Sequence, residues 1–200
     1  MAQSSPYHHG DLHAALLDGA DELLRADGIN GLSLRKLALA TGVSRTAPYH
    51  HFRDKHALLC SLAERGFKAL AELVEACRQQ GQGDPKQALT ALVERYLEFA
   101  TSHPERYELM FGRTIWQQGQ PTELLKTVAY DSFQQYLSFI DELLGARLDE
   151  KTPVLRVAQA TWGSLHGLCR LHIDGVYGDS TDRKGVSEVL VKIMLGECLG

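Results

Sequence analysis

Residues 34–52 read LRKLALATGVSRTAPYHHF, and this stretch decides the fold of the first part of the chain. Apolar side chains recur there at helical spacing and are followed by Gly42, which can adopt a positive φ without steric cost. A second short helix is predicted to start after a capping Ser44, with Pro48 in its first turn, where a helix tolerates proline. The residues predicted to point inward from the first helix are Leu34, Leu37 and Ala38. Two short helices joined by a glycine turn predict a helix-turn-helix.

A helix-turn-helix presents the start of its second helix to the major groove of DNA, while flanking side chains contact phosphates. Phe52 is predicted to anchor the end of that helix. Two alternatives remain open: Tyr49 can serve mainly in packing, and the whole segment can be a plain helical hairpin. The predicted DNA-binding residues are Ser33, Arg35, Ser44, Arg45, Thr46, Ala47, Tyr49, His50, His51 and Lys55.

The charge distribution favours the same segment. The chain of 200 residues has a formal net charge of −4, and residues 81–200 account for it with 12 basic and 16 acidic side chains. Residues 33–55 hold five basic side chains and one acidic one, a local net charge of +4. An acidic protein with one basic patch can bind DNA at that patch and is repelled elsewhere, so DNA contact is expected to be confined to residues 33–55.

Helical spacing continues to the C-terminus without a convincing strand pattern, so an all-α fold of about nine helices is predicted. The expected helices lie at about residues 11–27, 34–41, a short one after residue 44, 55–80, 84–102, 103–112, 122–148, 152–174 and 184–199. They predict a DNA-binding domain at residues 1–54, a connecting helix at 55–80, and an effector-binding and dimerisation domain at 81–200.

Several other classes of protein are disfavoured. No apolar run approaches the length of a membrane span and the first residues do not resemble a signal peptide, so a cytoplasmic protein is expected. Nucleotide-binding loops and a nucleophile elbow are absent, so neither an enzyme with catalytic residues nor a cofactor is predicted. His166, Cys169 and His172 are residue types that ligate zinc, but one helix would spread them over about 120° of its surface, so no metal site is predicted. The cysteines expected to be buried thiols are Cys60, Cys77, Cys169 and Cys198.

Residues 42–58 read GVSRTAPYHHFRDKHAL and resemble the signature of the tetracycline-repressor (TetR) family, G-V-S-x-x-x-x-Y-x-H-F-x-x-K-x-x-L, at every fixed position. The resemblance covers about residues 9–70 and implies a transcription regulator with an N-terminal helix-turn-helix. Thr46-Ala47-Pro48 stand where the family often has Gly-Thr-Leu or Gly-Ser-Phe. The preferred DNA sequence is therefore expected to differ from that of relatives.

The C-terminal part resembles a branch of the same family. Residues 162–167 read WGSLHG, residues 103–111 read HPERYELMF and residues 7–12 read YHHGDL, which together resemble the tryptophan-histidine-glycine type of C-terminal domain. The helix at 152–174 carries two apolar stripes, and Gly163 and Gly167 allow close approach of a second helix. Both stripes can instead be internal core. The residues predicted to form a homodimer interface are Val157, Thr161, Ser164, Leu168, Leu171, Val186, Leu190 and Ile193.

An effector pocket is expected among the C-terminal helices. Its predicted lining consists of large apolar, aromatic and histidine side chains, each of which can instead belong to the core. His166 is the best polar candidate, because a histidine on an apolar face needs a partner. The predicted ligand-binding residues are Phe99, His103, Tyr107, Met110, Phe111, Trp116, Phe133, Tyr136, Trp162 and His166.

The sequence thus favours a homodimeric repressor that leaves operator DNA when a small molecule binds. One alternative is an activator that its ligand switches on. Another is a helical ligand carrier or enzyme with a vestigial DNA-binding head, which would show no salt-dependent DNA binding.

Overall fold

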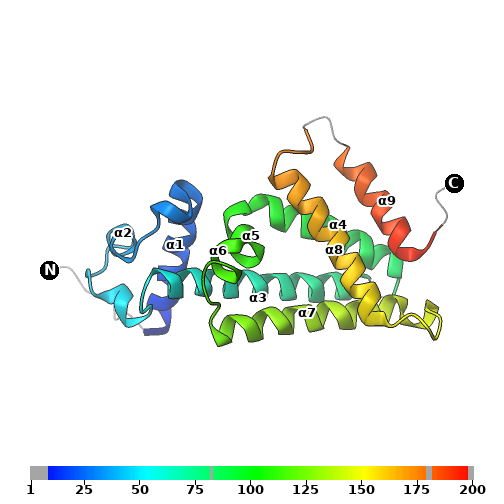
Figure 1. Ribbon diagram of the computed structural model, residues 1–200, viewed down its shortest axis with the longest axis horizontal. Coiled ribbons are helices and arrows are strands. Elements are labelled where there is room, and N and C mark those ends of the chain that lie inside the picture. Colours follow the sequence, from blue (N-terminus) through cyan, green and yellow to red (C-terminus); the bar gives the residue numbers. More distant parts are fainter. Residues whose placement is uncertain (1–8, 82, 179–181, 198–200) are drawn as a thin grey trace. The chain divides into compact units, whose positions relative to one another are not determined.

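The computed structural model describes residues 9–81, 83–178 and 182–197, and all regular structure in them is helical, which confirms the all-α prediction (Figure 1). The helices are α1 (His9–Gly31), α2 (Leu34–Ala40), α3 (Lys55–Gly81), α4 (Pro85–Ser102), α5 (Pro104–Phe111), α6 (Arg113–Trp116), α7 (Glu123–Leu144), α8 (Val154–Ile173) and α9 (Arg183–Leu195), with 3-10 turns η1 (Ala47–His50) and η2 (Gly145–Arg147).

The chain forms two compact units, and their boundary falls inside α3, after Gly66. The N-terminal unit comprises the chain through Gly66 together with Glu105–Lys126, and the C-terminal unit comprises Phe67–Pro104 and Thr127–Gly200. Residues 105–126, which carry α5 and α6, therefore pack with the helix-turn-helix although the sequence places them in the C-terminal half. The division into functional domains at residues 1–54, 55–80 and 81–200 stays a prediction.

The N-terminal unit is built on the apolar faces of α1, α2 and the start of α3. Leu34, Leu37 and Ala38 are buried, as their spacing predicted. Ser33 caps α2, since its side chain accepts a hydrogen bond from the backbone N–H of Lys36 at 3.1 Å. Further buried residues of this unit are Leu16, Ala20, Leu24, Phe52, Leu58 and Leu62.

The C-terminal unit packs α4 against α8 and α9. The indole N–H of Trp162 donates to the hydroxyl of Tyr96 at 2.9 Å. This hydrogen bond joins α8 to α4 and pairs the polar groups of two large aromatic side chains inside the unit. The hydroxyl of Tyr136 donates to Oγ1 of Thr161 at 2.9 Å and joins α7 to α8 in the same way. These bonds fix polar groups in an otherwise apolar core.

Two details differ from the prediction. The second helix of the motif is the 3-10 turn η1 and has no side-chain cap, although an α-helix capped by Ser44 was expected. The cause is Pro48: without an N–H it cannot donate to the carbonyl of Ser44, and the N–H of Ala47 makes the shorter-range bond to that carbonyl at 3.1 Å. In addition, α6 was not expected, and α7 ends at Leu144, where η2 follows.

Three of the four cysteines are buried thiols, as expected. Burial raises the pKa values of Cys60 and Cys77, so both stay protonated at neutral pH. Cys169 is buried too, while Cys198 lies outside the described residues, as do Tyr7 and His8. None of the helices described is both long enough and apolar enough to cross a membrane.

Candidate nucleic-acid interface and effector cavities

The turn of the helix-turn-helix has the geometry that its sequence predicts. Gly42 has a φ of 68°, in the left-handed region that favours glycine. The backbone N–H of Thr41 donates to the carbonyl of Leu37 at 2.9 Å, and that of Val43 donates to the carbonyl of Ala38 at 3.1 Å. The end of α2 is thus closed by main-chain bonds, and the chain is directed into η1.

The residues after this turn are displayed to solvent. Arg45, Thr46 and His50 are exposed, and the side chain of Tyr49 is 56% exposed although it is a large aromatic ring. Pro48 and Phe52 are buried beneath them, so Phe52 anchors the end of the turn as predicted. Ser44 is exposed and its hydroxyl lies 3.2 Å from that of Thr46, while Ala47 is half-buried. The turn therefore presents polar and aromatic side chains outward.

The local cations differ in whether they are already paired. Lys36 pairs with Asp27 at 3.3 Å, and Arg53 pairs with Asp54 at 3.0 Å. Asp54 also accepts the backbone N–H of Ala57 at 2.8 Å, and these bonds, that of Ala57 first, lower its pKa. In the described part of the chain no ion pair involves the remaining three cations of the patch, which are Arg35, Arg45 and Lys55. These three are the charges that phosphates can meet.

Two further residues differ from the predicted interface: one predicted residue is half-buried, and one exposed residue was not predicted. His51 is half-buried and its ring lies 5.6 Å from that of His13 on α1, so it helps to hold η1 against α1. Leu39 on α2 is 83% exposed, and it is not among the predicted interface residues. Its signal in the sequence is an apolar residue one position after the inward face, four residues from Arg35.

Ion pairs and hydrogen bonds connect residues 105–126 to α1 and α3 within the N-terminal unit. Arg106 on α5 donates to Asp21 on α1 at 3.0 Å, and Arg65 on α3 reaches the same carboxylate at 3.2 Å. Thr122, just before α7, donates to Glu64 at 3.1 Å. Residues 105–126, which follow α4 in the chain, are therefore joined to α1 and α3 of the N-terminal unit.

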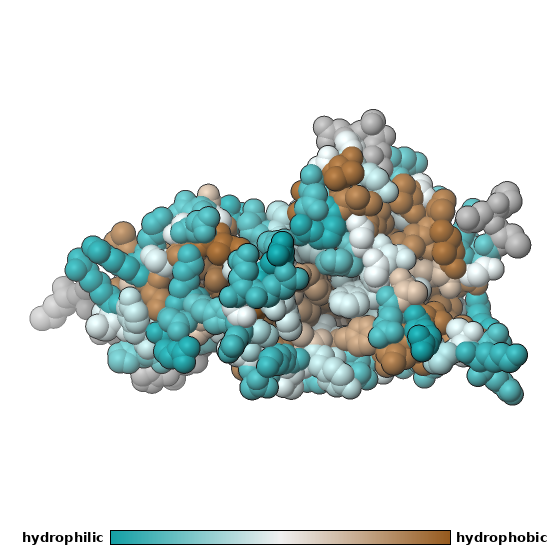
Figure 2. Space-filling model, in the orientation of Figure 1, coloured by the Kyte–Doolittle hydropathy of each residue, from teal (hydrophilic) through white to brown (hydrophobic). Residues whose placement is uncertain are grey.

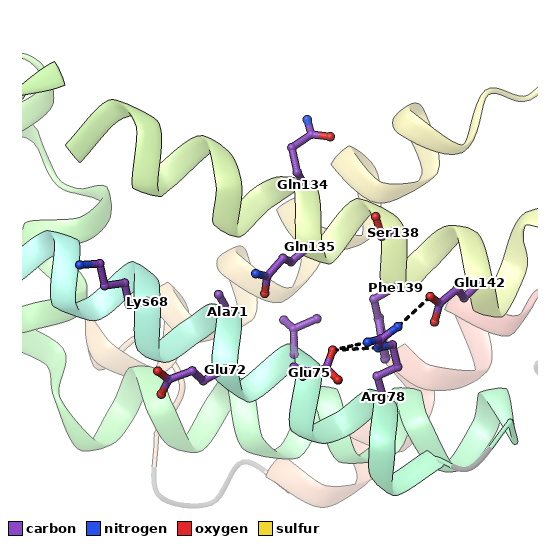
Figure 3. Close-up of a pocket in the computed structure, with 11 residues that line it drawn as sticks. Lys68, Ala71, Glu72, Glu75, Arg78, Gln134, Gln135, Ser138, Phe139 and Glu142 are labelled. Carbon is purple, nitrogen blue, oxygen red and sulfur yellow. Dashed lines mark hydrogen bonds and ion pairs between the residues drawn. The ribbon is translucent and has the colours of Figure 1, made fainter. Parts of the chain in front are cut away.

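One cavity of the C-terminal unit has a volume of about 730 Å³ and lies between α3 and α7 (Figure 3). Gln135 points from α7 toward α3, and Arg78 reaches from α3 to form ion pairs with Glu75 at 2.6 Å and Glu142 at 3.0 Å. The cavity is lined by Lys68, Ala71, Glu72, Val74, Glu75, Arg78, Gln134, Gln135, Ser138, Phe139 and Glu142. Its size is within the range of small-molecule sites.

None of the ten predicted ligand-binding residues lines that cavity. Phe99 and His103 line a smaller one of about 520 Å³ between α3 and α4. Phe133, Tyr136, Trp162 and His166 gather in the C-terminal unit, where Trp162 lies 5.6 Å from Phe133 and 6.3 Å from His166, ring centre to ring centre. The remaining four belong to the N-terminal unit and are Tyr107, Met110, Phe111 and Trp116. Most of the ten predicted residues are aromatic, whereas polar and charged residues line most of the cavity between α3 and α7.

The predicted dimer residues are divided between core and surface. Leu168 is buried, and Thr161 is held by the hydroxyl of Tyr136, so these two belong to the core of the C-terminal unit rather than to a surface. Ser164 and Ile193 are exposed, and the other predicted residues are half-buried, namely Val157, Leu171, Val186 and Leu190. Exposed apolar residues that the prediction omitted are Leu155 and Val189. Figure 2 shows the resulting apolar surface over α9.

The fold and this exposed turn define a helix-turn-helix DNA-binding regulator of transcription. The family model described as "Bacterial regulatory proteins, tetR family" matches residues 16–62, and the model "Tetracyclin repressor-like, C-terminal domain" matches residues 89–194, more than half of the chain. The chain belongs to the TetR family, which consists of transcription regulators and not of enzymes. The tryptophan-histidine-glycine type of C-terminal domain stays a prediction.

Similar proteins match either most of the chain or only its N-terminal part. The HTH-type transcriptional repressor AcnR of Corynebacterium efficiens is 33% identical over 186 residues, with 88% of this chain and 86% of that protein covered. The tetracycline repressor protein class A of Escherichia coli is 49% identical over 49 residues, which cover 24% of this chain and 23% of that one. A solved structure of a protein with unknown function from Rhodococcus sp. RHA1 is 31% identical, with a TM-score of 0.82 and coverage of 96% of this chain and 97% of that chain.

Proposed function

We propose that this protein is a homodimeric repressor that binds operator DNA through residues 33–55 and is released by a small-molecule effector. The observation that carries the proposal is the turn after Gly42, which holds exposed polar side chains beside three cations that form no ion pair within the described residues. Repression is supported by the names of similar proteins, including AcnR. Such a protein works in the cytoplasm, where the operator lies.

Each predicted contact has a distinct role in this proposal. Arg45, Thr46 and His50 reach base edges from η1, because they are exposed at the start of the recognition turn. Arg35 and Lys55 contact phosphates. Ser33 lies at the N-terminus of α2, where the first backbone N–H groups of the helix attract an anion such as a phosphate. His51 acts mainly by positioning η1.

DNA binding is tested with a matched pair of tyrosine variants. Tyr49 and Tyr130 are 56% and 63% exposed, so truncating either leaves the core intact, but only Tyr49 lies in the proposed interface. Fluorescence anisotropy with DNA from the flanks of the protein's own gene should show that Tyr49→Ala weakens binding at least tenfold and that Tyr130→Ala does not. A chain that binds no such fragment even at low salt would sink the proposal.

Salt dependence separates phosphate contacts from base contacts. Replacing Arg35 by alanine removes a proposed phosphate contact and should make the dependence of log K on log salt concentration less steep by about 1, whereas replacing Arg45, which reaches base edges, should leave the slope in place. A carrier or enzyme with a vestigial head would give no salt-dependent binding at all.

Dimerisation through α8 and α9 is supported by the apolar surface that these two helices expose in the single chain. Leu155, Val189 and Ile193 are exposed apolar residues on these helices. Gly163 and Gly167 have open space where a side chain would stand, so none of the described residues uses the close approach that they permit. Packing against a second copy would bury this face and place two recognition turns on palindromic DNA.

A further inference from the structure

The recognition segment between Gly42 and Phe52 contains a single permanently charged side chain, that of Arg45. This side chain is exposed, and within the described residues it forms neither an ion pair nor a hydrogen bond. A guanidinium has five N–H donors in a fixed fork, no acceptor, and a charge that it keeps in proteins. Arg45 therefore offers all of its donors to acceptors on a partner.

The backbone around Arg45 places it at the start of η1. The N–H of Ala47 donates to the carbonyl of Ser44 at 3.1 Å, so a closed turn contains Arg45, and the N–H of Tyr49 donates to the carbonyl of Thr46 at 3.1 Å. A helix-turn-helix directs the first residues of its second helix to base edges in the major groove. This position favours bases over the flanking phosphates as partners of Arg45.

The side chain next to Arg45 offers a methyl group. The hydroxyl of Thr46 lies 3.2 Å from that of Ser44, within hydrogen-bond distance, so it is already engaged in a local contact. Thr46 is exposed, and the contact of its hydroxyl leaves the Cγ2 methyl group as its uncommitted part. The start of η1 thus places a forked set of donors beside a small apolar group.

These two chemistries match different bases. Guanine presents two acceptors in the major groove, N7 and O6, which a forked guanidinium meets with two hydrogen bonds. Adenine presents one acceptor beside an amino donor, and cytosine presents an amino donor, so neither suits a side chain that has only donors. Thymine is the one base with a methyl group in the groove, which an apolar side chain contacts.

We propose that each operator half-site contains a guanine that Arg45 reads through N7 and O6, next to a thymine whose methyl group contacts Thr46. Consecutive Cα atoms lie about 3.8 Å apart and consecutive bases about 3.4 Å apart, so neighbouring side chains reach neighbouring base pairs. This inference rests on the proposed function, because it names the bases that the recognition turn reads in its operator.

The first test selects DNA without assuming an operator. The full-length protein is mixed at low salt with duplexes of random sequence, and the bound duplexes are sequenced. The selected half-sites should share one fixed guanine with a thymine beside it. Selected half-sites without a fixed guanine would overturn the inference.

A change of preferred base then assigns the guanine to Arg45. Glutamine pairs with N6 and N7 of adenine, so Arg45→Gln should change that one position from guanine to adenine and leave the other positions as they are. Loss of a merely structural side chain would weaken binding without a new preference. Arg35→Ala is the matched control, since Arg35 also lacks an ion pair within the described residues but is proposed to contact phosphate. It should weaken all sequences evenly, and a guanine retained in Arg45→Gln would reject the assignment.

Base analogues test the two contacts atom by atom in a selected duplex. Replacing the guanine by 7-deazaguanine removes the N7 acceptor and should weaken wild-type binding roughly tenfold, while leaving Arg45→Ala unaffected. Replacing the thymine by uracil removes only the methyl group and should cost wild type roughly fourfold, the size of one lost methyl contact. Thr46→Ser keeps the hydroxyl and loses the methyl, so it should not respond to uracil. Equal losses in wild type and Thr46→Ser would contradict the thymine contact.

The outcomes separate this inference from the proposed function. Selection of half-sites that share a sequence without a fixed guanine would reject the inference, while the DNA-binding regulator stands. Failure to enrich any duplex at low salt would reject both.

Discussion

At the scale of single residues, the ion pairs of this chain differ in how far their side chains are exposed to water, which can solvate a charge that has lost its partner. The side chains of Asp21 and Arg106 are only 11% and 15% exposed, whereas the pair of Lys36 with Asp27 lies in solvent. A partly buried charge that loses its partner costs far more than an exposed one, because desolvation is no longer offset. Asp21 forms ion pairs with two arginines, Arg106 and Arg65, so its removal takes this partner from both.

Replacing Asp21 by alanine should therefore destabilise the chain by about 2–4 kcal/mol, since Arg106 stays largely buried without a counter-charge. Urea unfolding followed by circular dichroism measures the change. Asp27→Ala removes an exposed ion pair and should cost about 0–1 kcal/mol. Equal losses in the two variants would show that the Asp21 pair is no more important than a surface pair.

His172 on α8 is a buried histidine whose two ring nitrogens lack hydrogen-bond partners in the described structure. Burial, and then the charge of Arg183, lower its pKa below the ordinary value of 6.5. The unfolded chain then binds this proton more readily than the folded chain does. Stability from this residue is complete above about pH 6.5, falls as the pH drops toward the lower folded pKa, and levels off below it.

His172→Gln should therefore flatten the fall in melting temperature between pH 7 and pH 5.5. Thermal unfolding of the two proteins at several pH values measures it. His50→Gln is the control, because it removes an exposed imidazole from η1 and should leave the slope unchanged. If His172→Gln keeps the slope of the wild type, another group causes the pH dependence.

At the scale of elements, the recognition turn depends on two residues with unusual backbone requirements. Pro48 prevents a regular α-helix from starting at Ser44 and leaves the compact turn η1. Gly42 has a positive φ, and a side chain there would meet nothing within 4 Å, so the demand on this position is purely conformational.

Replacing Gly42 by alanine should consequently cost about 1–2 kcal/mol, the price of a left-handed residue with a Cβ. Gly42→Asn should cost less, because asparagine tolerates this conformation. Urea unfolding ranks the three proteins, and DNA affinity should follow the same order. Equal stability of the alanine and asparagine variants would contradict a conformational origin.

At the scale of the whole molecule, the uncovered apolar face of α8 and α9 bears on the oligomeric state. Ile193 on α9 and Leu124 on α7 are equally accessible, at 56% and 57% exposure, but only Ile193 lies on the proposed interface. A charged residue there would have to lose its water on association, which is unfavourable without a partner.

Ile193→Asp should accordingly shift the protein from dimer to monomer and weaken DNA binding at least tenfold, while Leu124→Asp should change neither. Light scattering coupled to size-exclusion chromatography gives the mass, and anisotropy gives the affinity. A dimer that persists in Ile193→Asp would place the interface elsewhere.

The sequence by itself determined the all-α fold, the turn at Gly42, the inward face of α2 and membership of the TetR family. These features depend on local spacing and on single-residue backbone preferences, which a linear chain displays directly. It also indicated that Phe52 anchors the turn, because an apolar residue closes the motif.

Only the tertiary structure decided which residues meet. Residues 105–126 pack with the N-terminal unit because Arg106 and Thr122 bond to partners on α1 and α3, far away in sequence. The cavity between α3 and α7 brings together charged side chains from two helices that lie far apart in the sequence. Burial and pairing are properties of contacts between distant segments, so periodicity along one helix cannot specify them.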